Sequence, residues 1–204
     1  MPDGPRALLF DLGNVCLPFD HGRMVRQLAD LFEVPDECVR AALLDSRRLE
    51  AIERGEVSDD ELHASLCEQF GRAVNRRELF DAASDIFTPD PDMDALLAEL
   101  TGGGQPLVLV SNTSRPHIEF VRREYGVLEH FDRVVLSYEV RASKPEPAFY
   151  AAAAEAAGCE AGECFFTDDM PKNVDGAAAF GMDAVRFESA GQIRGELAAR
   201  GVLT

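Results

Sequence analysis

Five short and almost continuously apolar runs constrain the fold of this chain more than any other feature. They span Ala7–Phe10, Leu107–Val110, Arg133–Leu136, Cys164–Phe166 and Ala184–Phe187. Strands covered by helices on both faces show such runs, whereas half-exposed strands alternate polar and apolar residues. Helical patterns separate the last four runs, and two more precede the second run and close the chain. This alternation predicts an α/β fold with a doubly wound, mostly parallel sheet.

The segment from residue 17 to residue 88 interrupts the alternation, because its periodicity is helical throughout. Helices are predicted over Met24–Phe32, Asp36–Leu44, Asp59–Phe70 and Arg76–Ala83. Ser58 with Glu61 three residues later forms the pattern of a capping box at the start of the third helix. We therefore predict a core formed by residues 1–16 and 89–204, with a small helical cap at 17–88 inserted after the first strand.

Charge and cysteine usage restrict the partners and the compartment. The formal net charge of −17 argues against nucleic acid and anionic membranes as partners, because both repel an acidic protein. A phosphorylated metabolite stays compatible, since a bound cation can reverse the field within one cleft. The five cysteines are scattered without a CxxC pair, which favours reduced thiols. With no secretion signal and no apolar run of about 18 residues, we predict a cytoplasmic protein.

Polar residues follow the predicted strands at the edge where ligands of doubly wound sheets bind. They are Asp11 after the first run, Ser111 and Asn112 after the second, Lys144 after the third, and Asp168 and Asp169 after the fourth. Each has an ordinary structural interpretation when taken alone. A strand-ending Asp often caps a turn, a Ser often caps a helix, and an isolated Lys is usually solvated.

The combination indicates a site for a cation and a phosphate. Two adjacent carboxylates, Asp168 and Asp169, repel each other unless a cation lies beside them, and Mg²⁺ prefers such oxygen ligands. Hydroxyl and amide donors such as Ser111 and Asn112 suit a phosphate. Pro145 and Pro147 hold the chain around Lys144 in an extended turn, which places the lysine to bridge a carboxylate and a phosphate.

The order Asp, Ser, Lys, Asp-Asp at four consecutive strand ends resembles the four-motif signature of the haloacid dehalogenase superfamily, over essentially the whole chain. The stretches that carry the resemblance are FDLGNV at 10–15, SNTSR at 111–115, KPEP at 144–147, and DD at 168–169 followed by Asn173 and Gly181-Met182. Within the superfamily the chain is most similar to sugar phosphatases that hydrolyse glucose 1-phosphate, also in the cap segment 53–58. The N-terminal phosphatase domain of soluble epoxide hydrolase is a more distant relative.

The resemblance implies a Mg²⁺-dependent phosphomonoester hydrolase for small phosphorylated metabolites, sugar phosphates among them, acting as a monomer or homodimer. Asp11 would attack phosphorus and form an aspartyl-phosphate, and Ser111 with Asn112 would bind the transferred phosphoryl group. Lys144 would offset charge on Asp11 and on the phosphate. The metal ligands would be one Asp11 oxygen, the backbone carbonyl of Gly13, and Asp169, with Asp168 acting through water or from behind the direct ligands.

Gly13 departs from the pattern of the superfamily. Most of its phosphatases carry an Asp two residues after the nucleophile as general acid and base, a function that Gly cannot perform. Three explanations stay open: a leaving group such as an anomeric hydroxyl that needs little protonation, a substitute such as Asp20, His21 or a metal-bound water, or the loss of hydrolysis.

The missing Asp at position 13 keeps two other functions open. Halide leaves without a proton, so 2-haloacid dehalogenases also lack this Asp, although they do not use Mg²⁺. A non-catalytic phosphosugar-binding or regulatory protein on the same scaffold is the third hypothesis.

Several cap residues are candidates for contacting the leaving group, with a solvated helix face as the competing interpretation. They are His21, Arg23, Arg47 and Arg48. The remaining histidines have no spacing typical of a zinc site and receive no predicted role; they are His63, His117 and His130.

Overall fold

The computed structural model describes residues 4–44 and 48–203, and its centre is a parallel β-sheet of five strands within those residues. The strands are β1 (Ala7–Phe10), β2 (Leu107–Ser111), β3 (Arg133–Leu136), β4 (Cys164–Asp168) and β5 (Asp183–Arg186). Their order in the sheet is β3-β2-β1-β4-β5, so the connections run to one side of β1 and then to the other. The predicted doubly wound α/β fold is confirmed.

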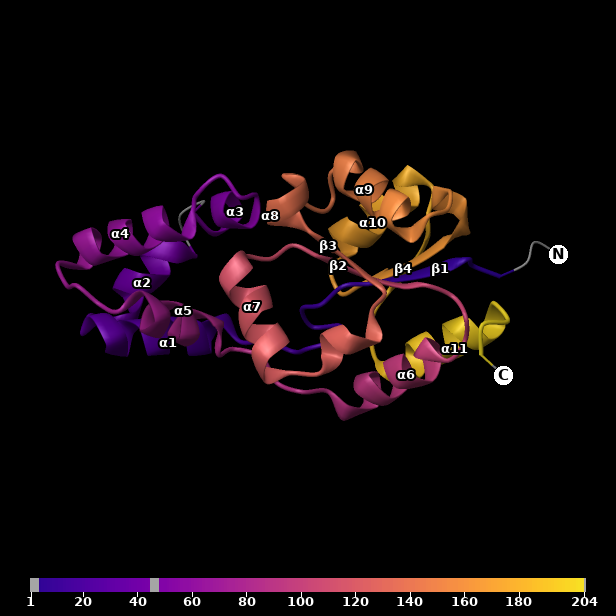
Figure 1. The fold of residues 1–204 in the computed structure, drawn as a ribbon, viewed down its shortest axis with the longest axis horizontal. Coiled ribbons are helices and arrows are strands. Elements are labelled where there is room, and N and C mark those ends of the chain that lie inside the picture. The colour runs from indigo at the N-terminus through magenta and orange to yellow at the C-terminus, as the bar shows by residue number, and fades with distance from the viewer. Residues whose placement is uncertain (1–3, 45–47, 204) are drawn as a thin grey trace.

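Helices cover both faces of this sheet, as Figure 1 shows, with α9 and α10 on one side and α6 and α11 on the other. Their bounds are α6 (Pro91–Thr101), α7 (Arg115–Glu124), α8 (Ser137–Val140), α9 (Pro147–Ala157), α10 (Pro171–Phe180) and α11 (Ala190–Ala199). Short 3₁₀ turns, η1 (Val127–His130) and η2 (Ala161–Glu163), precede β3 and β4. Alternate strand residues point to opposite faces, so Leu9 packs in the cluster of Phe149, while Leu8 packs in the cluster of Leu197.

Strand register brings the ends of the central strands to one edge of the sheet. Phe10 at the end of β1 lies opposite Leu109 of β2 and Thr167 of β4. The residues that follow these three positions therefore emerge side by side, at the edge where β1 separates the two halves of the sheet.

Between β1 and β2 the chain forms helices α1 (His21–Phe32), α2 (Asp36–Leu43), α3 (Arg48–Glu53), α4 (Asp59–Phe70) and α5 (Arg76–Ser84). They lie together at one end of the molecule (Figure 1). The prediction of four helices here was incomplete, because α3 has only six residues and is too short to show a helical period. The capping box of Ser58 and Glu61 at α4 is confirmed.

The apolar side chains of these helices do not form a core of their own. Met24, Leu28 and Leu66 belong to the same buried cluster as Leu8 and Phe10 of the sheet. The helical segment is thus anchored to one face of the sheet by continuous apolar packing.

A close approach of Gly55 to α8 adds a second anchor. Its φ is +67°, and a Cβ at this position would lie 2.6 Å from the carbonyl oxygen of Tyr138. A residue with a side chain would fit neither the backbone conformation nor the available space.

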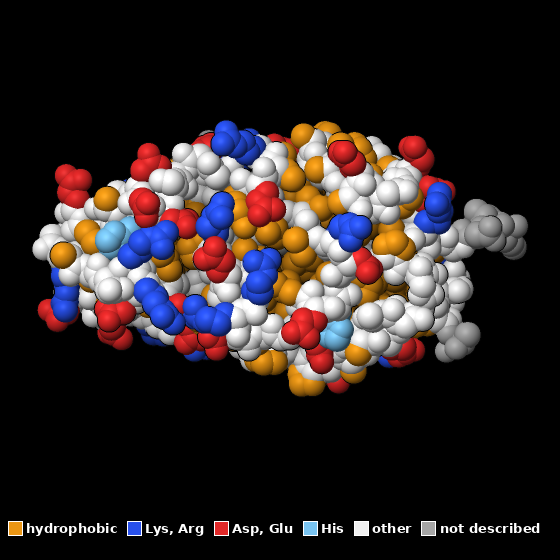
Figure 2. All heavy atoms as spheres, viewed as in Figure 1, with side chains coloured by type: hydrophobic (Ala, Val, Ile, Leu, Met, Phe, Trp, Pro, Cys, Tyr) orange, Lys and Arg blue, Asp and Glu red, His pale blue; other side chains and the backbone are white. Residues whose placement is uncertain are grey.

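The exterior is charged and mixed. In Figure 2 acidic and basic side chains are interspersed over the visible face. Within the described residues, the helices are all too short or too polar to cross a membrane. All five cysteines are free thiols in the structure.

Candidate active site

Lys144 joins two of the predicted carboxylates at the edge of the sheet. Its Nζ lies 2.7 Å from Oδ1 of Asp11 and 2.6 Å from Oδ2 of Asp168, and it donates to the carbonyl of Val110 at 3.0 Å. All three charged side chains are buried. Burial lowers the pKa of Lys144, but Asp11 and Asp168 outweigh that effect and the net shift is upward, so the ammonium stays charged.

Asp168 is held on every side. Besides Lys144, it accepts hydrogen bonds from the Asn173 side-chain amide at 2.9 and 3.0 Å and from the Met170 backbone at 2.9 Å. Asn173 lies on the first turn of α10, which begins two residues after the paired carboxylates. Both Asp168 oxygens are therefore occupied, and its evident effect is to orient Lys144.

Asp11 and Asp169 keep oxygen atoms available. Oδ1 of Asp11 accepts from the Leu12 backbone at 2.7 Å as well as from Lys144, whereas Oδ2 has no hydrogen-bond donor among the described residues. The half-buried Asp169 carboxylate accepts from Nδ2 of Asn14 at 3.3 Å. Asn14 has a φ of +56°, a left-handed conformation that Asn adopts more readily than most residues.

The donor set fits a divalent cation. Carboxylate oxygens of Asp11, Asp168 and Asp169 lie within 4.8 Å of one another, and the single ammonium of Lys144 leaves an excess of two negative charges. Burial is the main cause that raises the pKa of Asp11 to about 7. Burial and the nearby Asp168 also raise the pKa of Asp169. Repulsion between like charges of this kind is relieved by a hard cation. Mg²⁺ is such a cation and prefers oxygen ligands.

Asn112 lies beside the ammonium but uses its amide elsewhere. Its Nδ2 donates to the Lys144 carbonyl at 3.0 Å, and its Oδ1 accepts from the Lys144 backbone at 2.9 Å. These two bonds fix the loop that carries the lysine. Ser111, the last residue of β2, is buried and lines the cavity described next.

A cavity of about 70 Å³ lies between this edge and the helical segment. Its polar lining consists of His21, Glu53, Ser111, Asn112, Thr113 and His117. Gly13 lines it too, and a Cβ on Gly13 would lie only 2.7 Å from Cε1 of Phe19. The aromatic ring thus fills the direction in which a side chain at position 13 would point.

The cap residues that were candidates for contacting the leaving group lie in different places. His21 lines the cavity, with its ring 4.8 Å from that of Phe19. Asp20 caps α1 through the Gly22 amide and pairs with Arg26, and it does not line the cavity. Arg23 pairs with Asp85, and Arg48 donates to Gln69 at 3.1 Å. Arg47 lies outside the described residues.

Sequence reasoning missed two cavity residues. Glu53 ends α3, and the only signal was its place in the cap segment 53–58, which carried a resemblance but no role. His117 was assigned no role, yet it lines the cavity with its Nε2 3.3 Å from the Ala83 carbonyl. Burial lowers the pKa of His117 to about 4, so it is neutral at pH 7.

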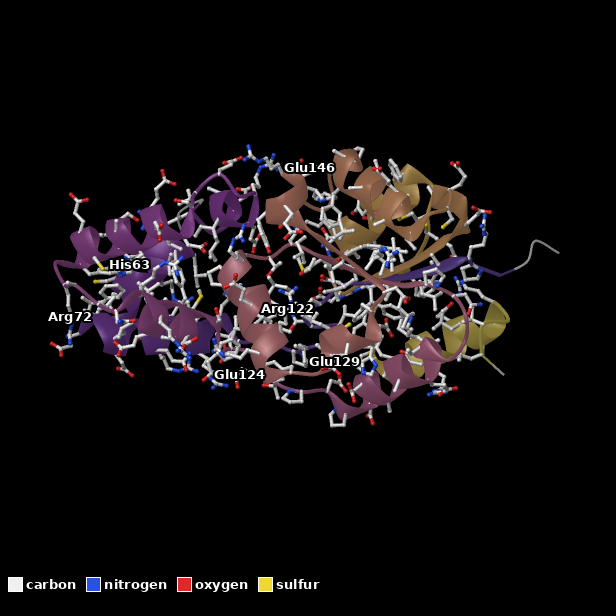
Figure 3. The ribbon with its side chains drawn as sticks, in the orientation of Figure 1. His63, Arg72, Arg122, Glu124, Glu129 and Glu146 are labelled. Atoms are coloured by element: carbon white, nitrogen blue, oxygen red, sulfur yellow. The ribbon has the colours of Figure 1, made fainter. Side chains whose placement is uncertain are left out.

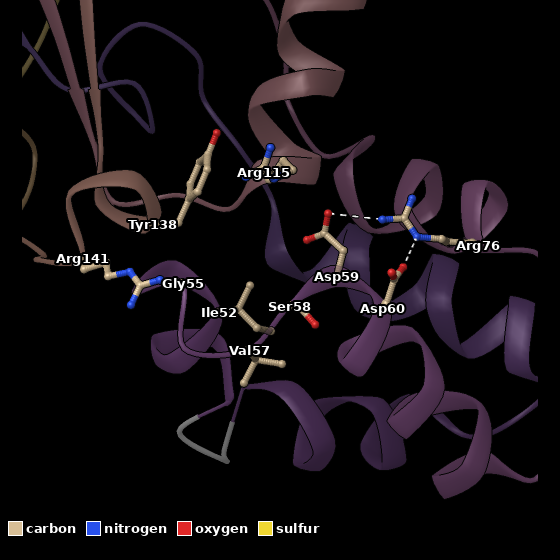
Figure 4. A pocket seen from close by; sticks show the side chains of 10 residues that line it. All are labelled: Ile52, Gly55, Val57, Ser58, Asp59, Asp60, Arg76, Arg115, Tyr138 and Arg141. Atoms are coloured by element: carbon tan, nitrogen blue, oxygen red, sulfur yellow. Dashed lines mark hydrogen bonds and ion pairs between the residues drawn. The ribbon is translucent and has the colours of Figure 1, made fainter.

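A second cavity, of about 470 Å³, lies where the turn between α3 and α4 faces α7 and α8 (Figure 4). Its charged lining is largely paired, since Arg76 bonds to Asp59 and Asp60, and the Arg115 guanidinium lies 5.3 Å from the Tyr138 ring centre. The smaller cavity is lined by Gly13, Ser111 and Asn112, from the same edge of the sheet as Asp11, so we place the candidate chemistry there.

A comparison with protein families identifies the chain. The model of the haloacid dehalogenase-like hydrolases matches residues 5–181. The chain belongs to this family. Within it, phosphatases and dehalogenases share one scaffold, and the curated relatives include both.

The sesquiterpene phosphatase astK of Aspergillus oryzae is 27% identical over 178 residues, which cover 87% of each chain. The phosphatase MT3486 of Mycobacterium tuberculosis is 41% identical over 105 residues, 51% of this chain and 48% of that protein. The haloacetate dehalogenase H-2 of a Moraxella species is 33% identical over 93 residues, 46% of this chain and 42% of that protein.

Among solved structures, the HAD family enzyme bt-2542 of Bacteroides thetaiotaomicron, in complex with magnesium and inorganic phosphate, aligns with a TM-score of 0.76. It is 28% identical, and the alignment covers 92% of this chain and 96% of that one. Together with the phosphatase relatives, this identifies the chain as a phosphatase-type hydrolase of the haloacid dehalogenase-like family.

Proposed function

We propose that this hydrolase is a Mg²⁺-dependent phosphomonoesterase that acts on small phosphorylated metabolites through an aspartyl-phosphate on Asp11. The observation that carries the proposal is the buried Asp11, with one oxygen bound by Lys144 and the other free of donors among the described residues, next to Asp169. Such an arrangement suits both attack on phosphorus and cation binding.

In the proposed reaction, an Asp11 oxygen attacks phosphorus, the bond to the leaving oxygen breaks, and water later hydrolyses the aspartyl-phosphate. Lys144 offsets charge on the transferred group, and Ser111 donates a hydrogen bond to one of its oxygens. Asp168 and Asn112 keep Lys144 in place through the contacts described above. Mg²⁺ would be held by Asp11, Asp169 and the Gly13 carbonyl, and it would supply the positive charge that the phosphate needs.

Sugar phosphates are the substrate class we propose. The cavity combines His21, Glu53 and Ser111 with apolar walls at Leu49 and Phe87, and polyhydroxylated leaving groups need both kinds of contact. Its volume of about 70 Å³ is well below the roughly 300–1,000 Å³ of small-molecule sites, so we expect the helical segment to move outward when substrate enters. The resemblance to glucose-1-phosphate phosphatases in segment 53–58 supports this class.

A dehalogenase is the second candidate, favoured by Gly13 and by the Moraxella relative. Electrostatics argues against it. The two excess negative charges around Asp11 would repel the carboxylate of a haloacid, whereas with a cation they suit a phosphate.

The deciding experiment measures phosphate release from sugar phosphates, nucleotides and p-nitrophenyl phosphate, with Mg²⁺ and with EDTA. We expect turnover that EDTA abolishes and that Asp11→Asn lowers at least about 10³-fold. The exposed Asp175→Asn is the matched control and should retain activity. Halide release from 2-chloropropionate is assayed in parallel.

Folded protein that binds Mg²⁺ but releases no phosphate from any compound would contradict the proposal. Halide release under those conditions would establish the dehalogenase instead.

A further inference from the structure

The phosphoryl end of the site lacks a group that can move a proton to and from the leaving oxygen. Position 13, where most phosphatases of this type carry that group, is a glycine with the Phe19 ring 2.7 Å from where its Cβ would lie. The ring occupies the direction in which a carboxyl there would extend. A proton donor has to come from another element that faces the cavity.

The other groups at the cavity are unsuitable donors. Burial lowers the pKa of both His21 and His117, which disfavours the protonated ring that could donate. The Asn112 amide is occupied by the Lys144 backbone. Asp20 is bound to Gly22 and Arg26 and does not line the cavity.

Glu53 is the only carboxyl among the described residues that line this cavity. It is the last residue of α3 and is partly buried. Across the described parts of the chain, its carboxyl has neither a hydrogen bond nor an ion pair, although Arg54 beside it pairs with both Glu56 and Glu146. A partly buried carboxyl that faces a polar cavity without a partner is available to a ligand.

We propose that Glu53 is the general acid and base of the reaction, supplied by the cap in place of a carboxyl at position 13. The proposal rests on the phosphatase function proposed above. In the first step an Asp11 oxygen forms a bond to phosphorus, while the bond to the leaving oxygen breaks with its electron pair. Glu53 gives its proton to that oxygen, and a neutral alcohol leaves.

In the second step the Glu53 carboxylate takes a proton from the attacking water. The water oxygen bonds to phosphorus, and the bond between phosphorus and the Asp11 oxygen breaks. Inorganic phosphate leaves, and both the Asp11 carboxylate and the Glu53 acid are restored. The cycle therefore needs no other proton source.

Electrostatics at Glu53 suits both steps. Burial raises its pKa to about 7, which Lys144 and Lys172 partly counteract and Glu50 reinforces. The other titratable groups lining the cavity are His21 and His117, and burial lowers the pKa of both, which disfavours their charged forms. Both protonation states of Glu53 are thus populated near neutral pH, the condition under which a general acid–base group is most effective.

The test compares Glu53→Gln with wild type on phenyl phosphate and p-nitrophenyl phosphate, followed by stopped flow with Mg²⁺ present. The two substrates have similar shapes, but phenolate needs a proton to leave and the less basic p-nitrophenolate does not. We expect the variant to lose about 10²–10⁴-fold in turnover of phenyl phosphate. On p-nitrophenyl phosphate it should release a burst of one equivalent of p-nitrophenolate and then turn over slowly, because the second step still lacks its base.

The control is Glu37→Gln, an exposed position on α2 of the cap, which should behave like wild type on both substrates. The melting temperature and the affinity for inorganic phosphate show whether Glu53→Gln keeps its fold and its phosphate site. Wild-type activity with no effect of Glu53→Gln would overturn the inference and leave the phosphatase function intact. An equal loss of the first step on both substrates would overturn it as well, since that pattern indicates a binding role.

Discussion

The two walls of the small cavity differ in how their charged groups are satisfied. On the sheet side, Asn112 lines the cavity, and Lys144, Asp168 and Asn112 bond to one another or to the backbone at 2.6–3.0 Å. The carboxylates there are tied to strand ends. On the cap wall, Glu53 lies on a six-residue helix without a hydrogen-bond or ion-pair partner in the described chain. The sheet side is therefore preorganised for the phosphoryl group, which every phosphomonoester shares. The cap wall remains available to the leaving group, which differs between substrates.

The largest effect on stability and turnover is expected when Lys144, the buried ammonium at the sheet edge, is replaced. Lys144→Met would leave Asp11 and Asp168 buried beside each other without a counter-charge. Removing one partner of a buried ion pair costs about 3–5 kcal/mol of unfolding free energy, and loss of the phosphoryl contact should cost a further 10²–10³-fold, roughly, in turnover. Urea denaturation and phosphate release measure the two effects.

Arg194→Met is the control for that change. It breaks an exposed ion pair with Glu99 on the far side of the core, where we expect a loss under about 1 kcal/mol. Equal destabilisation by the two variants would refute the view that the sheet side depends on its buried ammonium.

The same contrast explains what the sequence predicts well. The strands, and with them Asp11, Ser111 and the paired carboxylates, could be predicted because buried parallel strands have apolar runs and end at a common edge. These residues emerge side by side because Phe10, Leu109 and Thr167 are in register. Lys144 follows α8 and not the end of β3 itself. This part of the site follows from local pattern and topology.

The cap wall could not be predicted in that way. α3 is too short for a period, and the exposure of Glu53 to the cavity depends on how Gly55 seats against Tyr138, a tertiary contact with no local signature. The absence of a side chain at Gly13 is visible in the sequence, but its cause, the Phe19 ring, is not. What the sequence missed is therefore set by the packing of one element on another.

The packing of the cap against the core can be disrupted by a substitution at Gly55. Gly55→Ala places a Cβ 2.6 Å from the Tyr138 carbonyl at a φ of +67°, beside the turn shown in Figure 4. Gly71→Ala is the matched control, because its φ is +65° and nothing lies within 4 Å of the added Cβ. Both variants should lose about 1 kcal/mol from the left-handed backbone, and Gly55→Ala about 1–3 kcal/mol more from the clash.

Chemical denaturation of the two glycine variants gives that difference directly. We also expect Gly55→Ala to shift KM for p-nitrophenyl phosphate, because it displaces the cap wall, and Gly71→Ala to leave KM unchanged. Identical losses in both variants would mean that the cap does not depend on this contact.

The pH dependence of stability sharpens the comparison at Glu53 itself. Its pKa is 4.5 in an ordinary setting and about 7 in the fold, mainly through burial. Between these values the folded protein holds a proton that the unfolded chain has lost, so this group lowers the unfolding free energy as pH rises from about 4.5 through 7. The shift corresponds to about 1–3 kcal/mol for a partly buried group.

Glu53→Gln removes this titration. Relative to wild type, its unfolding free energy should rise with pH across that range, and urea titrations at pH 5 and pH 8 measure the change. Glu37→Gln, at an exposed position on α2, should follow the wild-type curve. A constant offset between Glu53→Gln and wild type at both pH values would show that Glu53 is solvated like an ordinary surface carboxyl.

The smallest effect is expected at the ion pair between Arg54 and Glu146, which connects the two walls. Arg54 follows Glu53, and Glu146, labelled in Figure 3, lies two residues after Lys144 and directly before α9. Both side chains are partly exposed, so Arg54→Ala should cost under about 1 kcal/mol and raise KM for p-nitrophenyl phosphate by about twofold. If the pair orients the cap wall, Glu146→Ala should have the same effect, the double variant should add nothing, and about 0.5 M salt should remove the difference from wild type. Additive losses that persist in salt would instead assign Arg54 a packing role and leave the seating of the cap to Gly55 alone.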